Sequence, residues 1–168
     1  MTSPSTPEDF RAMWTAARPD LDTSPMDVVR PVKRIEALLT TAVEPLYEGA
    51  PLTAPELDAL VQLRHAEGPV IARRLAETLG CSRAAVSKTL AKLEKRGFVE
   101  RRPSPADRRA ALVTVTPAGS DAVDEMFPRQ LAVEAELLGS LGADRDRVVD
   151  ALNLLEEVLQ QRVGRQRA

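Results

Sequence analysis

The side chains best suited to bind a polyanion lie on a predicted helix that begins after Ser82 and ends near Arg96. Those outside its predicted buried stripe include Arg83, Ser87, Lys88 and Lys92. In the major groove of DNA, Arg and Lys donate to guanine O6 and N7, and serine bonds to several base edges. A lysine can also neutralise a phosphate, which adds affinity without reading sequence. We therefore predict base contacts for the first three of these residues and a phosphate contact for Lys92.

The elements around this helix have the spacing of a helix-turn-helix. A first helix is predicted over residues 73–79, and Ala76, Gly80 and Val86 supply the small residue, the turn glycine and the core residue that the motif requires. Glycine ends a helix with positive φ at no steric cost, and Ser82 is a favourable N-cap for the second helix. Leu90 and Leu93 continue the buried stripe at helical spacing.

Two predicted strands, over residues 98–102 and 111–115, follow the second helix and flank a basic loop. This pattern is typical of a wing, and Val70 and Ile71 can add a short third strand beside it. We predict phosphate contacts for Arg101 and Arg102 in the first of these strands. At the loop tip, Arg109 suits the negative potential of a narrow minor groove, with Arg108 as its competitor.

The segment LAETLGCSRAAVSKTLAKLEKRGFVERRPSPADRRAALVTVTPAG resembles the MarR family of winged-helix transcription regulators. This resemblance implies a homodimer built from both terminal regions, bound to double-stranded DNA at a pseudo-palindromic site. It also implies that Asp107 pairs with Arg109 and holds it in the wing. The fold class that we predict is mainly α with a small β wing, in which dimerisation helices flank a winged helix-turn-helix core.

The charge distribution agrees with a DNA-binding face. Between Ser82 and Arg109, nine basic and three acidic side chains give a net charge of +6. Because the whole chain has a net charge of −2, the remaining residues together have a net charge of −8. A basic module within an acidic body is the electrostatic footprint of nucleic-acid binding confined to one face. The alternative for a charge run is a solvated helix face.

The composition excludes several other classes of protein. With 43% apolar and 29% charged residues, the 168-residue chain is an ordinary globular protein, and no apolar run approaches a membrane span. The first ten residues lack the profile of a secretion signal, so we expect a cytoplasmic protein. No catalytic motif or metal-ligand spacing is present, and we expect neither an enzyme nor a cofactor. The single cysteine, Cys81, suits a small buried position in the turn better than a redox sensor.

We divide the chain into a disordered tail at 1–6, N-terminal helices at 7–50, the winged helix-turn-helix at 51–116 and C-terminal helices at 117–168. The terminal helices present more apolar surface than one winged helix can cover. Such stripes are normally buried against a second copy, although packing within one chain is the alternative.

A ligand site is suggested by a second resemblance, to the urate-responsive branch of the family. That branch has an extra N-terminal helix with a tryptophan, an aspartate in the second helix and arginines beside the wing. Trp14, Asp58 and Arg101 match it, whereas Thr89 stands where a second arginine is expected. A tryptophan stacks on a planar ligand and an arginine pairs with its anionic oxygens, so a small aromatic acid is the expected effector. The alternative is that Trp14 anchors its helix and Asp58 is a surface carboxylate.

These features together predict a DNA-binding transcription regulator, acting as a repressor that a small aromatic anion releases. The alternative is a winged helix that binds proteins, or that binds DNA architecturally without a ligand.

Overall fold

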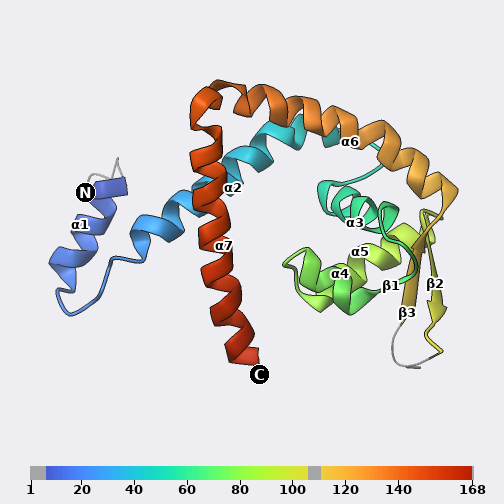
Figure 1. Ribbon diagram of the computed structural model, residues 1–168, viewed down its shortest axis with the longest axis horizontal. Helices are drawn as coiled ribbons and strands as arrows, with labels where there is room; N and C mark the ends of the chain where they lie inside the picture. The colour runs from blue at the N-terminus through green and yellow to red at the C-terminus, as the bar shows by residue number, and fades with distance from the viewer. Residues whose placement is uncertain (1–6, 106–110, 168) are drawn as a thin grey trace. The chain divides into compact units, whose positions relative to one another are not determined.

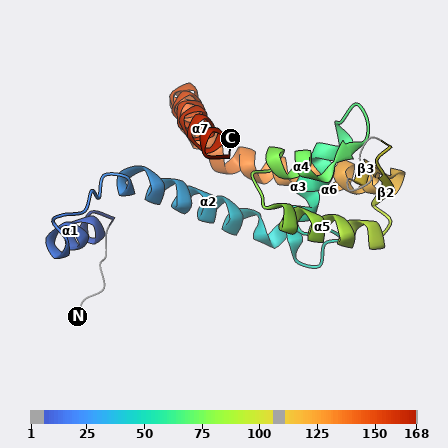
Figure 2. The ribbon, with the colours of Figure 1, turned by 90° about the horizontal axis from the view of Figure 1, so that it is seen from below.

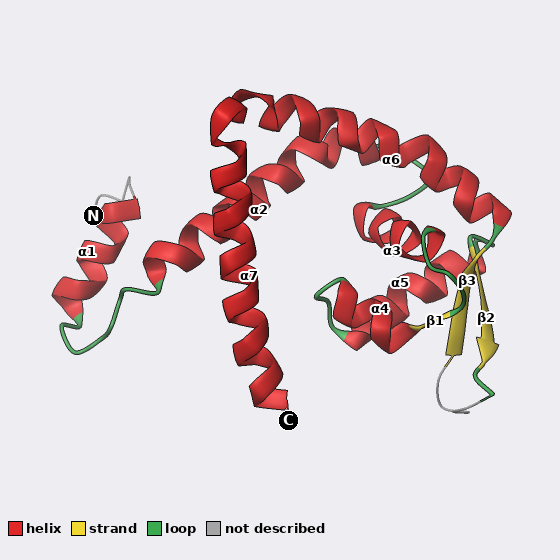
Figure 3. Cartoon of the chain, in the orientation of Figure 1, coloured by secondary structure: helices red, strands yellow, loops and turns green. Residues whose placement is uncertain are grey.

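The computed structural model describes the backbone of residues 7–105 and 111–167, and the side chains of residues 10–105 and 111–163. Its elements are α1 (Pro7–Ala17), α2 (Met26–Tyr47), α3 (Ala54–Arg64), β1 (Val70–Ile71), α4 (Ala72–Thr78), α5 (Arg83–Lys95), β2 (Val99–Pro103), β3 (Ala111–Val115), α6 (Pro117–Leu138), a 3-10 segment (Gly139–Asp144) and α7 (Arg145–Arg167). Figure 3 shows helices over most of the described chain and strands in one place only. The predicted class, mainly α with a small β wing, is confirmed.

The chain forms two compact units, which meet between Gln130 and Leu131 within α6. The first contains α1 to α5, the strands and the first part of α6 (Figure 1). The second contains the end of α6, the 3-10 segment and α7. The domain boundaries at residues 50 and 116 stay a prediction, and the predicted tail at 1–6 lies outside the described residues.

The three strands form one antiparallel sheet in the order β1-β3-β2. In the central strand, Val113 is paired with Val70 on one side and with Arg101 on the other. Figures 1 and 2 both show β2 and β3 side by side next to the helices α3 to α5. The third strand beside the wing, expected from Val70 and Ile71, is therefore present.

The core of the first unit lies where this sheet meets α3, α4, α5 and the first turns of α6. Leu60, Leu90, Leu93 and Val113 are completely buried there. Leu90 and Leu93 belong to the predicted stripe of α5, as does Val86, which is also buried. Burial of such side chains contributes about 1.5–3 kcal/mol each, so this stripe fixes which face of α5 remains outside.

Local sequence signals set the ends of the two helices in the motif. Gly80 has φ 63°, and the Cys81 N–H donates to the Ala76 carbonyl at 3.0 Å, which closes the end of α4. Ser82 Oγ accepts from the Ala85 N–H at 3.1 Å and caps α5 as predicted. The helix-turn-helix is thus formed by the residues that its spacing indicated.

The burial of Cys81 differs from the prediction. This residue was expected to be buried in the turn, but it is exposed. The turn uses the backbone of Cys81, and its thiol only reaches the Leu79 carbonyl, at a sulfur-to-oxygen distance of 3.4 Å. The prediction was wrong because the small core position of this turn is taken by Ala76, which is 3% exposed.

At the start of α2, Ser24 followed by Pro25 is a pattern typical of an N-cap and first-turn pair, but the structure differs. Pro25 occupies the N-cap, and no side chain caps the helix. The backbone N–H of Ser24 instead donates to Asp22 Oδ1 at 2.9 Å, which forms a turn ahead of the helix. Pro45 does not end α2, because the helix continues to Tyr47.

The junction between the wing and α6 is unusually close. Thr116 Oγ1 accepts from the Gly119 N–H at 3.1 Å and so caps α6. A Cβ at Gly119 would overlap the Phe98 carbonyl and lie 2.8 Å from Val115 Cγ2. Glycine is therefore required where α6 passes the root of β2.

Candidate DNA interface

The outer face of α5 carries the predicted base-reading residues. Arg83, Ser87 and Lys88 are all exposed, as is the predicted phosphate contact Lys92. Because Ser82 caps the helix and its apolar stripe faces the core, these side chains project from its first three turns toward solvent. This is the presentation that a recognition helix needs.

The basic side chains of this face are not paired with carboxylates of the described residues. Within the described part of the chain, Arg83, Lys88, Lys92 and Lys95 form no ion pair. An uncompensated row of cations creates a positive potential that attracts a polyanion. The outer face of α5 is therefore expected to have a positive potential, which would favour binding of a polyanion such as DNA.

The arginines of β2 have a different environment. Arg101 pairs with Glu94 at 3.5 Å, and Arg102 pairs with Glu100 at 3.0 Å. The second pair is highly exposed, with 78% of the Arg102 side chain accessible, and such pairs contribute about 0–1 kcal/mol. Arg102 can therefore exchange Glu100 for a phosphate at little cost, and its phosphate contact stays a prediction.

Arg101 lies in a small hollow of about 410 Å³ at the root of the wing. Its Nε is buried and has no hydrogen-bond partner among the described residues. Glu94, Glu100 and Thr116 also line this hollow. The hollow combines an incompletely bonded guanidinium with two carboxylates, so it does not by itself favour an anion.

The three predicted wing-tip residues, Asp107, Arg108 and Arg109, lie outside the described residues. Their predicted roles in the minor groove therefore stay predictions.

Arg96 was counted among the basic residues of the DNA-binding segment, but the structure gives it a structural partner. Its guanidinium bonds to the buried Glu56 at 3.1 Å and lies 4.8 Å from the centre of the Phe98 ring. The capping box of Thr53 and Glu56 was visible in the sequence. No local signal indicated that the same carboxylate would bind a residue forty positions later.

The predicted ligand residues lie on three different elements. Trp14 is in α1 and is 45% exposed in the single chain. Asp58 is exposed on α3, and Arg101 is half-buried on β2. The hollow beside Arg101 is lined by neither Trp14 nor Asp58. Thr89, at the place of the expected second arginine, is half-buried on α5.

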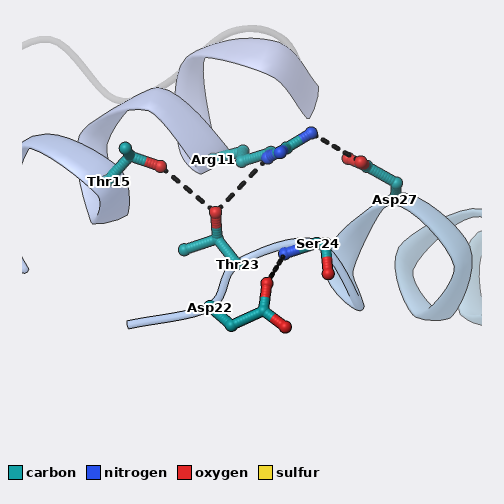
Figure 4. A network of polar contacts seen from close by, with 6 residues as sticks. All are labelled: Arg11, Thr15, Asp22, Thr23, Ser24 and Asp27. Atoms are coloured by element: carbon teal, nitrogen blue, oxygen red, sulfur yellow. Dashed lines mark hydrogen bonds and ion pairs between the residues drawn. The ribbon is translucent and has the colours of Figure 1, made fainter. Parts of the chain in front are cut away.

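A polar network fastens α1 to the start of α2 (Figure 4). Arg11 donates to Asp27 at 2.5 Å and to Thr23 Oγ1 at 3.3 Å, and Thr15 meets the same hydroxyl at 3.2 Å. Arg30 lies 4.8 Å from the ring centre of Phe10. A hollow of about 760 Å³ separates the two helices here. The network places the helix that carries Trp14 beside α2.

Hydrogen bonds from Arg18 and Ser24 stabilise the two carboxylates of the intervening loop. The Arg18 guanidinium lowers the pKa of Asp20, and bonds from Ser24 lower the pKa of Asp22. Both carboxylates are therefore held in their ionised form by the folded loop.

The described residues were also compared with the requirements of a metal site and of a membrane-spanning helix. The described residues contain no group of three or more His, Cys, Asp or Glu side chains placed to hold a metal ion. None of the described helices has both the length and the apolar character needed to cross a bilayer.

Comparisons with known proteins agree with this geometry. The model of the MarR family matches residues 50–110. The HTH-type transcriptional regulator PecS of Dickeya dadantii is 25% identical over 146 residues, which cover 86% of this chain and 88% of PecS. The regulator YwaE of Bacillus subtilis is 31% identical over 85 residues, about half of each chain.

Two solved structures share the fold over most of the chain. A mutant of MarR from E. coli in complex with operator DNA is 25% identical, with a TM-score of 0.69 over 83% of this chain and 99% of MarR. BpsR of Bordetella bronchiseptica, whose DNA binding is regulated by 6-hydroxynicotinic acid, is 26% identical, with a TM-score of 0.70 over 77% of this chain and 92% of BpsR. Residues 50–110 therefore match the MarR family of transcription regulators, and most of the chain shares the winged helix-turn-helix fold of the solved MarR structure.

Proposed function

We propose that this protein is a homodimeric transcription repressor that binds a pseudo-palindromic operator and is released by a small aromatic anion. The observation that carries the proposal is the exposed, uncompensated row of cations on α5. Arg83, Ser87 and Lys88 read bases, whereas Lys92, Arg101 and Arg102 contact phosphates. The wing arginines at 108 and 109 add contacts in the minor groove.

Dimer formation is supported by apolar side chains that the single chain leaves exposed. On α2 they are Val28, Val29, Val32, Ile35, Leu38 and Leu39, and on α7 they include Val148, Leu152, Leu159 and Val163. Exposed stripes of this length normally bury themselves against a second copy with two-fold symmetry. A two-fold dimer places two recognition helices on half-sites about one DNA turn apart.

Effector release is supported by one structural neighbour. BpsR binds DNA under the control of an aromatic acid. We propose that the effector binds preferentially to a dimer whose recognition helices do not fit the operator, and so shifts the population away from DNA. Trp14, Asp58 and Arg101 are the proposed contacts of the effector.

Selection of bound sites from a pool of random duplexes by the full-length protein tests DNA recognition. A repressor of this type should enrich a pseudo-palindrome, and its affinity should fall steeply with salt, by a slope of about 0.9 per phosphate neutralised. Salt-independent binding, or no enrichment, would indicate a winged helix that contacts proteins.

The recovered duplex then serves to test release. Benzoate, salicylate, 6-hydroxynicotinate and urate are added to the complex, with quenching of Trp14 fluorescence as the second readout. Release of DNA without quenching would remove Trp14 from the effector site. The absence of either response to all four acids would contradict effector control by this class of compound.

A further inference from the structure

One buried carboxylate joins the start of α3 to the end of α5. Glu56 is only 4% exposed. Its Oε2 accepts from the backbone N–H of Thr53 at 2.9 Å and from the Arg96 guanidinium at 3.1 Å. A carboxylate with so little access to water is stable only when its charge is matched, and Arg96 provides the match.

Arg96 occupies the C-cap of the recognition helix, where the chain turns into the wing. Gly97 has φ 77°, its N–H donates to the Glu94 carbonyl at 2.9 Å, and the Phe98 N–H donates to the Leu93 carbonyl at 3.0 Å. These two bonds form a Schellman turn. The Arg96 side chain then stacks on the Phe98 ring, so it holds both ends of the turn.

The same turn is bonded to the first residues of α6. The Thr116 N–H donates to the Phe98 carbonyl at 3.0 Å, and Thr116 Oγ1 donates to the Gly97 carbonyl at 2.7 Å. Gly119 packs directly against the Phe98 carbonyl. The recognition helix, the wing and α6 therefore meet at the residues that Glu56 and Arg96 hold.

We propose that Glu56 and Arg96 are positioning residues for DNA recognition. Arg96 touches no phosphate, because its charge is committed to Glu56. It sets the direction of the recognition helix relative to the wing, and so lets both enter neighbouring grooves at once. This inference rests on the DNA-binding function proposed above.

The test compares full-length variants on the selected duplex and on a scrambled duplex of the same length. Arg96→Met and Glu56→Gln each break the pair, Arg96→Lys keeps its charge, and Lys92→Met is the matched control for a phosphate contact. Dissociation constants are measured by fluorescence anisotropy at several potassium chloride concentrations. Urea titrations identify conditions in which every variant is fully folded.

The two pair-breaking variants should bind the selected duplex about 3- to 30-fold more weakly while folded, with unchanged affinity for the scrambled duplex. Their salt slopes should equal that of the wild type, whereas Lys92→Met should reduce the slope by about 0.9. The double variant Glu56→Gln/Arg96→Met should bind the selected duplex no more weakly than the single variant with the lower affinity. Arg96→Lys should recover part of the lost affinity. This recovery separates positioning from mere folding, and it keeps the test valid if Arg96→Met does not fold.

Three results would overturn the inference. A salt slope reduced by about 0.9 in Arg96→Met would show that Arg96 contacts a phosphate. An unchanged ratio of selected to scrambled affinity would reduce the pair to a stabilising role, and additive losses would show that the two residues act independently. Failure of the wild type to enrich any duplex would instead count against the proposed function.

Discussion

At the scale of single residues, the basic side chains of the winged helix fall into two groups. Those on the outer face of α5 have no ion-pair partner in the described part of the chain, whereas Arg96, Arg101 and Arg102 face carboxylates. A count of charges along the sequence treats all of them alike. The structure therefore limits the basic residues that could contact DNA without first breaking an ion pair.

Substitution of Lys88 tests whether this residue contacts a base or a phosphate. Lys88→Met keeps the helix propensity but removes the donor. It should weaken binding to the selected duplex by about 1–3 kcal/mol and relax the preference at one base pair. Anisotropy titrations against duplexes with each base at that position check this. Equal losses on the selected and scrambled duplexes would assign Lys88 to a phosphate instead.

At the scale of elements, the sequence predicted the winged helix well because its signals are local. Ser82 and Gly80 each act within a few residues of their own position, and the structure uses both as expected. The exposed position of Cys81 and the unusual start of α2 were missed. Each depends on which neighbour takes a core or cap position, and residue type alone does not decide that.

The candidate site was less predictable than the fold. Exposure of the α5 residues followed from the helical period and the buried stripe. The pairing of Glu56 with Arg96 did not, because it joins residues forty positions apart through the tertiary packing of α3 on α5. The same reason applies to Gly119, whose requirement for glycine arises only where α6 passes Phe98.

The loop between α1 and α2 should respond to acid. Asp20 and Asp22 have lowered pKa values in the fold, so the folded loop binds fewer protons than the unfolded loop. Their contribution to holding α1 is complete above the unfolded pKa of about 3.9 and is lost as pH falls through the lower folded values. We expect Trp14 fluorescence to change below about pH 4.

Asp22→Asn is the control for this pH dependence, because the amide oxygen can still accept from Ser24 without titrating. This variant should lose part of the acid transition at Trp14. An identical transition in the variant would show that Asp22 does not cause the change.

At the scale of the whole molecule, the apolar stripe of α2 calls for a partner. Ile35 lies on this stripe and is 48% exposed in the single chain. Ile35→Asp would place an unpaired charge in a dimer interface, so the dimer should dissociate at least about tenfold more readily. Sedimentation equilibrium checks this.

Ala37→Asp is the matched control, since the exposed residue 37 lies on the face of α2 opposite the stripe at 100° per residue. It should leave the dimer intact. A monomeric wild type, or equal dissociation of both variants, would contradict the dimer model. The operator affinity of Ile35→Asp should also fall, because a monomer engages only one half-site.

The double use of Glu56 Oε2 has a consequence for how this sequence can change over evolution. One atom serves the start of α3 and the end of α5, so we expect positions 56 and 96 to change together even though forty residues separate them. A substitution at either position leaves a donor or a buried charge unmatched until the other changes. Lineages that lose the arginine are therefore expected to replace the glutamate as well, and to obtain the cap of α3 from another residue.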